Sequence, residues 1–371
     1  MKIKAALLSK IHGDYTIENL RLAEPREDEV RVKLVASGIC HSDEATRIGD
    51  STIPFPAVLG HEGAGIVEFV GSEVKNIKVG DHVVMSYSYC GHCANCRTGL
   101  PAACNDWPAL NSSGSRPDGS HVFNQEDGTP VSNFFYQSSF ATHTLTKENN
   151  LIVVDKSADL RLVGTLGCGF LTGLGTVING LKPTVGSSIA IFGTGAVGLA
   201  AMMAAKISGC STIIAVDIHQ SRLDIAKQLG ATHLVDSSTG DTTKQIKAIT
   251  DGLGVNYSVD TTGISAVMQT ALNSMRTRGT MAPVAVTSKN MDINTFRQLV
   301  VSSKKIIGVL MGDAIPQISI PQLIKFYQEG RFPFDKLVKF YKLEEINQAS
   351  KDSANGSTIK PILIIDEHYK N

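Results

Sequence analysis

The chain has 371 residues, which exceeds what a single hydrophobic core usually serves, so two domains are expected. Apolar residues make up 42% and charged residues 19% of the chain, a balance that is typical of a globular enzyme and excludes a disordered chain. Lysine plus arginine equals aspartate plus glutamate at 35 each, so the charge provides no footprint for nucleic acid or for an anionic membrane.

The first ten residues contain an apolar run that is too short for a signal peptide. Every later apolar stretch is broken by charges or glycines before it reaches membrane-spanning length. We therefore expect a cytoplasmic protein with no membrane partner. In that reducing compartment the seven cysteines more often bind metal than form disulfides.

The N-terminal part is rich in short β-strands. Residues 29–36 alternate between apolar and polar side chains, which predicts a strand. Residues 64–70 and 81–85 predict further strands, separated by Gly71 and Gly80. This pattern indicates a compact, partly open barrel.

Cys40 and His61 are the first residues that suggest chemistry, because both are ligand types that Zn²⁺ prefers. A catalytic zinc takes three protein ligands and keeps one open position. Asp43 can orient the His61 ring by accepting its other N–H, and Ser42 can pass a proton beside the open position. A buried thiol and a satisfied histidine are the commoner explanation for such residues singly, so the rest of the chain has to decide.

Four cysteines follow at close spacing: Cys90, Cys93, Cys96 and Cys104. Two Cys-x-x-Cys steps and a fourth thiol eight residues later can surround one tetrahedral ion and leave no open position. This spacing favours a structural zinc site over a redox pair.

Residues 105–135 contain many glycine, proline, serine, asparagine and aspartate residues, which predicts a long loop. Long ordered loops in compact enzymes tend to be lids, binding loops or subunit contacts. The loop ends in Phe134, Phe135 and Tyr136, and this aromatic cluster is equally compatible with core packing and with a pocket wall.

Cys168 lies between Gly167 and Gly169, after a helical stretch. Flanking glycines allow the backbone to approach a bulky ligand closely. Cys168 is therefore the candidate for the third ligand of the catalytic zinc.

The pattern changes after residue 186. An apolar strand at 188–192 leads directly into Gly-x-Gly-x-x-Gly at 193–198, then into a helix at 199–208 and a strand at 212–216 that ends at Asp217. The glycines make a tight turn and let a pyrophosphate lie on the helix N-terminus. The acid comes 19 residues after the last glycine, where it can bind both ribose hydroxyls and repel a 2′-phosphate.

The alternation of strands and helices continues and gives about six strands of a doubly wound parallel sheet. Helices are predicted at 221–229, 242–249, 266–274, 320–329 and 343–350, and strands at 233–235, 257–260, 281–286 and 305–309. A last strand at 359–365 can return to the first domain.

Together these residues resemble the zinc-dependent medium-chain alcohol dehydrogenases, over nearly the whole chain. The resemblance is carried by Gly60-His61-Glu62 with Gly65 and Gly71, the four clustered cysteines, Gly167 to Phe170 and Gly193 to Gly198. Softer features, Cys40 to Asp43 and the loop from Ser113 to Gly119, are most similar to the aryl-alcohol (benzyl-alcohol) branch.

The resemblance implies an α/β fold with two domains. A β-rich GroES-like catalytic domain is expected at residues 1–170, with a C-terminal return at 311–371. A Rossmann domain, the doubly wound parallel sheet that binds the dinucleotide, is expected at 171–310.

The resemblance also implies roles for individual residues. It assigns the catalytic zinc to Cys40, His61 and Cys168, a carboxylate near the metal to Glu62, and the hydroxyl that receives the alcohol proton to Ser42. It places His41 and Lys360 against the coenzyme pyrophosphate and Arg222 beside the adenosine ribose. The other expected coenzyme contacts are Gly193, Gly195, Val197, Gly198, Asp217, Thr172 and Val284, and the expected substrate contacts are Ser86, Phe134 and Phe135.

One position departs from the family pattern. Many relatives end their proton relay at a histidine five residues after the zinc cysteine, and here that position is Ala45. The relay therefore ends in water or uses His41. Cys210 remains outside both zinc sites and is predicted to pack in the core.

The sequence thus predicts an NAD-dependent enzyme with one catalytic and one structural zinc that interconverts primary aromatic alcohols and aldehydes. Its partners would be a small-molecule alcohol or aldehyde and further copies of itself, as a dimer or tetramer. Short aliphatic alcohols or a formaldehyde–thiol adduct are alternative substrates. A structural NAD-binding protein and a zinc-ribbon nucleic-acid module are non-enzyme alternatives; the complete ligand set argues against the first, and the neutral charge against the second.

Overall fold

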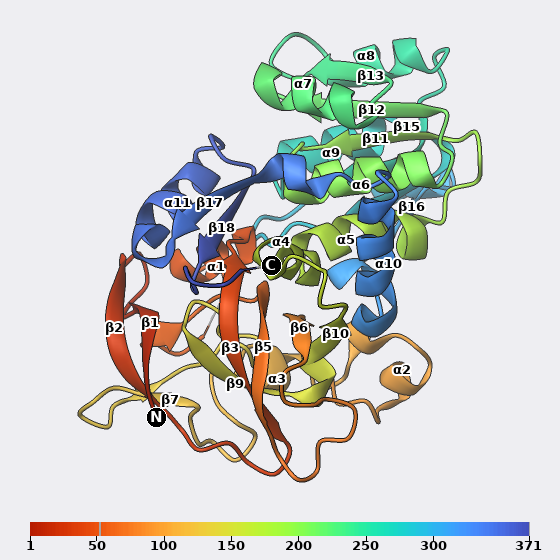
Figure 1. The fold of residues 1–371 in the computed structure, drawn as a ribbon. Coiled ribbons are helices and arrows are strands. Elements are labelled where there is room, and N and C mark those ends of the chain that lie inside the picture. The colour runs from red at the N-terminus through yellow and green to blue at the C-terminus, as the bar shows by residue number, and fades with distance from the viewer. Residues whose placement is uncertain (52, 371) are drawn as a thin grey trace. The chain divides into compact units, whose positions relative to one another are not determined.

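The computed structural model describes residues 1–51 and 53–370. The chain divides into two compact units (Figure 1). The first contains Met1–Cys168, Ile315–Lys325 and Asp335–Asn371, and the second contains Gly169–Ala314 and Phe326–Phe334. The domain limits at 170 and 311 stay a prediction.

The first unit contains two sheets. The five-stranded sheet has the order β4-β1-β2-β7-β8, and the seven-stranded sheet has the order β10-β6-β5-β3-β18-β17, with β9 also paired to β3. The strands are β1 Lys2–Leu8, β2 Tyr15–Leu22, β3 Glu29–Gly38, β4 Ala57–Val58, β5 Gly63–Val70, β6 His82–Met85, β7 Phe123–Asn124, β8 Pro130–Val131, β9 His143–Lys147, β10 Leu151–Val154, β17 Val338–Lys342 and β18 Lys360–Ile364.

Strand β3 organises this unit, because it ends two residues before Cys40. The strands predicted at 29–36, 64–70 and 81–85 are confirmed as β3, β5 and β6. The predicted C-terminal strand is confirmed as β18, which pairs antiparallel with β3 so that Ile362 lies opposite Gly38. This pairing brings the end of the chain beside the segment that carries Cys40.

The helices of the first unit are short: α1 His41–Arg47, α2 Ala94–Arg97, α3 Trp107–Asn111, α4 Leu160–Val163 and α11 Ile346–Ala354. Helix α10, Pro316–Gln328, begins in the first unit and ends in the second. The long loop predicted at 105–135 is interrupted by three short elements, α3, β7 and β8. Elements of two to five residues are too short for hydrophobic periodicity to reveal them.

The second unit is built on a six-stranded parallel sheet with the order β13-β12-β11-β14-β15-β16 (Figure 1). The strands are β11 Ser188–Phe192, β12 Thr212–Asp217, β13 His233–Asp236, β14 Val255–Asp260, β15 Met275–Pro283 and β16 Lys305–Ile306. The helices are α5 Gly169–Gly175, α6 Ala196–Ile207, α7 Gln220–Leu229, α8 Thr242–Ile249 and α9 Ser265–Asn273. The predicted doubly wound parallel sheet is thereby confirmed.

Two details of the second unit differ from the prediction. Strand β15 begins at Met275 rather than at residue 281, and its pairing with β14 is interrupted by a register shift. Arg278 has a left-handed φ of 65° inside this interruption, which breaks the period that marks a strand in the sequence. Two π-helical segments, Thr176–Leu181 and Thr295–Val300, were not predicted.

Each unit has its own hydrophobic core. In the first unit, Leu7, Val58 and Phe140 belong to a cluster of buried side chains that also includes Ile346 and Ala349 of α11. In the second, Phe192 and Ile214 belong to a separate cluster. Among the described residues no single helix is long and apolar enough to cross a membrane, and one bent pair, Leu160–Gly167 with Gly169–Leu181, passes by length and composition only.

Candidate active site

The first unit brings Cys40, His61 and Cys168 together. One potential ligand atom of each lies within 4.8 Å of the others, and the two sulfurs are 3.9 Å apart. Cys40 follows β3, His61 precedes β5, and Cys168 follows the 3-10 turn Gly164–Gly167. Three separate segments thus converge on one buried point with a thiol, an imidazole and a thiol.

Asp43 holds the His61 ring in one orientation. Its Oδ1 lies 3.0 Å from His61 Nδ1 and also accepts from the backbone N–H of Gly60 at 3.0 Å. Its Oδ2 accepts from the backbone N–H of Cys40 at 2.9 Å. An acceptor at Nδ1 keeps the proton there and turns the lone pair of Nε2 outward.

The donor set fits a zinc ion. His61 Nε2 is buried and finds no hydrogen-bond partner in the described part of the chain, which is costly for a polar atom unless a ligand takes it. The Cys168 thiol and the His61 ring hold the pKa of Cys40 well below its usual range, although burial opposes this. A thiolate, a thiol beside it and an unpartnered imidazole nitrogen form the chemistry that tetrahedral zinc selects.

Helix α1 carries the proposed proton path. Ser42 is half-buried, and its hydroxyl lies 4.0 Å from the Cys40 sulfur. His41 is the first residue of α1 and is exposed, whereas Ala45 is buried in the same helix. The two possible ends of the relay, water and His41, both remain predictions.

Glu62 and Lys360 form a fully buried ion pair. Lys360 Nζ lies 2.9 and 2.8 Å from the two carboxylate oxygens of Glu62, and donates to the Ile39 carbonyl at 3.2 Å. The Lys360 and Glu62 side chains are 2% and 0% exposed. Burial lowers the pKa of Lys360, but the attraction of Glu62 outweighs it and raises that pKa above its ordinary value. The coenzyme contact expected of Lys360 stays a prediction, and the structure adds this buried ion pair to it.

Phe134 and Phe135 pack on the His61 ring. The Phe135 ring is stacked on the imidazole with centroids 4.7 Å apart, and the Phe134 ring meets it edge-on at 5.4 Å. Phe134 is buried, and Phe135 is half-buried. Ser86 is also buried, and its hydroxyl donates to the Gly167 carbonyl at 2.7 Å.

Two amides that the sequence did not mark connect these segments. Gln137 donates to the carbonyls of His61 at 3.0 Å and of Ser86 at 3.1 Å. Asn150 donates to the carbonyls of Ser86 and Phe135, both at 3.0 Å. Each acts on backbone far away in the sequence, so no local pattern could have indicated it.

The four clustered cysteines form a second group. The potential ligand atoms of Cys90, Cys93, Cys96 and Cys104 all lie within 4.8 Å of one another. Backbone N–H groups point at the sulfurs, and those of Asn105 and Cys96 lower the pKa of Cys93 to about 6. Four thiols complete a tetrahedral shell, so this group fits a closed zinc site.

Two further residues lie outside the catalytic cluster, and Cys210 is less buried than the core packing that the sequence predicted for it. His92 is exposed, and its Nδ1 lies 2.9 Å from the Cys90 carbonyl. Cys210 is half-buried with its sulfur 3.8 Å from the Ser187 hydroxyl.

The second unit forms the glycine-rich turn between β11 and α6. Gly193 has a left-handed φ of 85°, and a Cβ at Gly198 would lie 1.9 Å from the Gly193 carbonyl oxygen, so both positions require glycine. At Gly195, the N-cap of α6, no described atom lies within 4 Å of the position that a Cβ would take. Val197 follows in the first turn. The N–H groups that begin α6 can therefore be approached by an anion, as a dinucleotide pyrophosphate requires.

Asp217 ends β12 and supports this turn. Its Oδ2 accepts from the backbone N–H and the hydroxyl of Thr194, both at 2.7 Å. Its Oδ1 accepts from the N–H groups of Ile218 at 2.8 Å and His219 at 3.0 Å. Burial raises the pKa of Asp217, but these donors, with Arg222 nearby, bring it below its ordinary value. The carboxylate is therefore held in its charged form.

The last two predicted coenzyme residues lie elsewhere in the second unit. Thr172 is on α5, with its hydroxyl 4.0 Å from the Met311 sulfur. Val284 follows β15, and its N–H donates to the Asp260 carbonyl at 2.9 Å.

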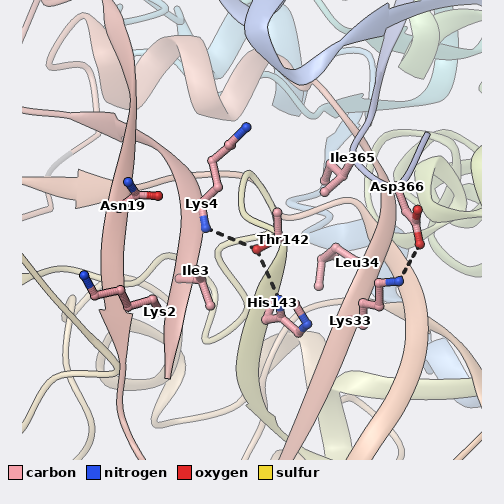
Figure 2. Close-up of a pocket in the computed structure, with 10 residues that line it drawn as sticks. All are labelled: Lys2, Ile3, Lys4, Asn19, Lys33, Leu34, Thr142, His143, Ile365 and Asp366. Atoms are coloured by element: carbon pink, nitrogen blue, oxygen red, sulfur yellow. Dashed lines mark hydrogen bonds and ion pairs between the residues drawn. The ribbon is translucent and has the colours of Figure 1, made fainter. Parts of the chain in front are cut away.

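A pocket of about 320 Å³ in the first unit contains none of the predicted site residues (Figure 2). Its lysines face carboxylates: Lys33 lies 2.7 Å from Asp366, Lys2 pairs with Glu126, and Lys4 pairs with Glu344. Because these three lysines are already paired, none of them is a free cation for a ligand.

Two family models match the chain. The alcohol dehydrogenase GroES-like domain matches residues 26–156, and the zinc-binding dehydrogenase model matches residues 196–329. Geraniol dehydrogenase of Castellaniella defragrans is 39% identical over 97% of this chain and 97% of its own length.

Two further proteins are similar over almost their full length. Benzyl alcohol dehydrogenase of Acinetobacter calcoaceticus has a crystal structure with a TM-score of 0.93 and 46% identity, covering 98% of this chain and 99% of that one. A probable S-(hydroxymethyl)glutathione dehydrogenase of Schizosaccharomyces pombe is 36% identical, over 97% of this chain and 96% of its own.

Proposed function

Because this chain belongs to the zinc-binding alcohol dehydrogenase family, we propose that it oxidises primary aromatic alcohols to aldehydes with NAD, and catalyses the reverse reaction. Zinc and a nicotinamide dinucleotide are its cofactors. When bound, the zinc supplies Lewis acidity for the alcohol oxygen and the nicotinamide supplies the two-electron redox chemistry. The observation that carries the proposal is the buried Cys40–His61–Cys168 cluster with its unpartnered imidazole nitrogen.

We assign a separate role to each residue in and beside the cluster. Cys40, His61 and Cys168 would hold the catalytic zinc, because three protein donors leave a fourth position for substrate. Asp43 fixes the His61 tautomer through its contact with Nδ1. Ser42, whose hydroxyl lies beside the Cys40 sulfur, accepts the proton that the alcohol loses and passes it to water or to His41.

The four remaining metal-site cysteines have a different task. Cys90, Cys93, Cys96 and Cys104 would hold the structural zinc and stabilise their loop, because a closed site contributes folding free energy. The predicted cytoplasmic location, which rests on the short apolar runs of the sequence, and the predicted dimer or tetramer stay proposals.

We expect NAD to be preferred over NADP because the Asp217 carboxylate is held charged at the end of β12. A 2′-phosphate beside it would be repelled by about 1–2 kcal/mol, which corresponds to about tenfold in kcat/KM. In Asp217→Asn the ratio of kcat/KM for NAD over NADP should fall by about that factor. Asp251→Asn, on the exposed turn after α8 in the same unit, is the control and should leave this ratio unchanged. Equal kcat/KM for the two coenzymes in the unmodified enzyme would contradict the assignment.

The aromatic preference rests on two observations. Phe134 and Phe135 surround the imidazole of the zinc cluster, and a benzyl alcohol dehydrogenase is 46% identical to this chain. Burying a phenyl ring contributes roughly 2–3 kcal/mol, plus about 1 kcal/mol from aromatic contact. A second candidate substrate is a non-aromatic unsaturated alcohol such as geraniol. The similarity to a geraniol dehydrogenase, at 39% identity, supports this candidate. The similarity to the probable S-(hydroxymethyl)glutathione dehydrogenase supports a third candidate substrate, a formaldehyde–thiol adduct.

A comparison of alcohols tests this assignment. We expect kcat/KM for benzyl alcohol to exceed that for ethanol by about two orders of magnitude, with cyclohexylmethanol and geraniol in between. Phe134→Ala should reduce the preference about tenfold. Phe340→Ala, which removes an exposed ring from β17, should leave it unchanged. If geraniol or the formaldehyde–glutathione adduct is the best substrate, the aromatic assignment is wrong although the enzyme class stands.

A further inference from the structure

The turn that carries the aromatic side chains is strained. Phe135, Tyr136 and Ser138 have left-handed φ values of 53°, 49° and 44°. Non-glycine residues disfavour this region by roughly 1–2 kcal/mol each, so surrounding contacts must hold the turn in place.

Local hydrogen bonds supply part of the support. The Phe134 N–H donates to the Ser138 hydroxyl at 2.8 Å, and that hydroxyl donates to the Val58 carbonyl at 2.7 Å. The Phe135 N–H donates to the Asn111 carbonyl at 3.0 Å. The N–H groups of Gln137 and Ser138 also donate to the Phe134 carbonyl, both at 3.0 Å, and close the turn around Tyr136. These bonds act on the backbone and do not involve the Tyr136 side chain.

Tyr136 is held by a buried ion pair that the proposed chemistry does not use. Its hydroxyl donates to Glu29 Oε1 at 3.0 Å. Arg116 grips the same carboxylate with two parallel bonds, Nε to Oε1 and Nη2 to Oε2, both 2.7 Å long. The exposed fractions are 0% for Glu29, 4% for Arg116 and 2% for Tyr136.

Further hydrogen bonds hold both partners of the ion pair in place. Glu29 begins β3, and its Oε2 also accepts from the Arg26 N–H at 3.0 Å. Arg116 donates from Nη1 to the His121 carbonyl at 3.1 Å. Burial raises the pKa of Glu29, but the bonds from Arg116 bring it below its ordinary value, so the acceptor stays charged. Charge-assisted, bidentate bonds of this kind are among the strongest and most directional in proteins.

We infer that Glu29, Arg116 and Tyr136 are positioning residues for the alcohol substrate. By holding Tyr136 they keep the turn left-handed, and so they set where the rings of Phe134 and Phe135 lie on His61. The loop of residues 113–119 would thus act on the substrate through Arg116 and the turn rather than by touching it. The inference deepens the proposed function and rests on it for its substrate readout.

The chain provides a readout that needs no substrate. Trp107 is the single tryptophan, and its ring meets the Phe135 ring edge-on at 6.0 Å. Its emission therefore reports where Phe135 lies. This measurement separates a failure of the inference from a failure of the proposed function.

The test uses the zinc-loaded enzyme with Tyr136→Phe, which removes one hydroxyl and keeps the ring. We expect the Trp107 emission maximum to move and its quenching by acrylamide to increase. The KM for benzyl alcohol should rise so that its kcat/KM falls about tenfold, while ethanol changes less than about threefold, because misplaced binding groups penalise the larger substrate more. Arg116→Lys keeps the positive charge but cannot form the two parallel hydrogen bonds to Glu29. It should show the same changes more weakly.

Asp118→Asn is the matched control. Asp118 lies on the same loop and pairs with Arg26 at 2.6 Å, but the pair is about half exposed and does not reach Tyr136. It should alter neither the emission nor the ratio of the two alcohols. Unchanged emission in Tyr136→Phe, or an equal loss for both alcohols, would overturn the inference. If the unmodified enzyme shows no aromatic preference, the proposed function fails and the emission alone decides the inference.

Discussion

Cys168→Ser is expected to lower kcat by a factor of about 10³ or more while the chain stays folded, because it removes one of the three donors proposed for the catalytic zinc. Zinc analysis should give one ion per chain instead of two, since the four-cysteine cluster is unaffected. The remaining Cys40 and His61 would bind zinc weakly, with only two donors.

The control for this prediction is Cys210→Ser. Cys210 is a half-buried thiol in the second unit, outside both metal clusters, so both zinc ions and full activity should remain. Circular dichroism of the two variants should match that of the unmodified enzyme. Two zinc ions in Cys168→Ser, or a loss of activity in Cys210→Ser, would contradict the assignment.

The sequence predicted the parts of the site that depend on local spacing. Cys90, Cys93 and Cys96 lie within one short loop, and Gly193 to Gly198 form one turn, so their geometry follows from chain connectivity. The parallel sheet could also be predicted, because the sequence alternates between strand and helix patterns.

The sequence could not indicate contacts that depend on tertiary structure. Gln137 reaches back to the carbonyl of His61, and Arg116 reaches back to Glu29, 87 positions away. Such contacts form only when distant segments of the chain pack together in the folded protein. In the sequence, each of these residues is indistinguishable from an ordinary loop or strand residue. The short α3 was missed for a related reason, because five residues carry no periodic signal.

Lys360 also makes a contact that the local sequence could not indicate. The resemblance predicts that Lys360 faces the coenzyme pyrophosphate. In the structure its ammonium donates to both carboxylate oxygens of Glu62 and to the Ile39 carbonyl. The pairing of β18 with β3 places it there, and that pairing joins opposite ends of the chain. We therefore expect neutralisation of the buried Glu62 to be a role of Lys360, and the contact with the pyrophosphate stays a prediction.

Lys360→Met should destabilise the zinc-loaded enzyme by about 3–5 kcal/mol, because it removes the positive charge that pairs with the buried Glu62 carboxylate. The measurement is urea unfolding at fixed zinc concentration. Lys33→Met is the control: Lys33 lies on β3 and pairs with Asp366, but its side chain is 43% exposed, so its loss should cost at most about 1 kcal/mol.

The double variant Glu62→Gln with Lys360→Met decides between the two roles of Lys360. If the ion pair is the main role, removing both charges should recover most of the lost stability, because the buried negative charge is then removed together with the positive charge of Lys360. The KM for NAD should then change little in either variant. If Lys360 instead binds the pyrophosphate, the single variant should raise the KM for NAD with little loss of stability, and the double variant should not restore it. The ion-pair role predicts a loss of stability with an unchanged KM for NAD, and the coenzyme role predicts the reverse. The single and double variants together therefore distinguish the two roles.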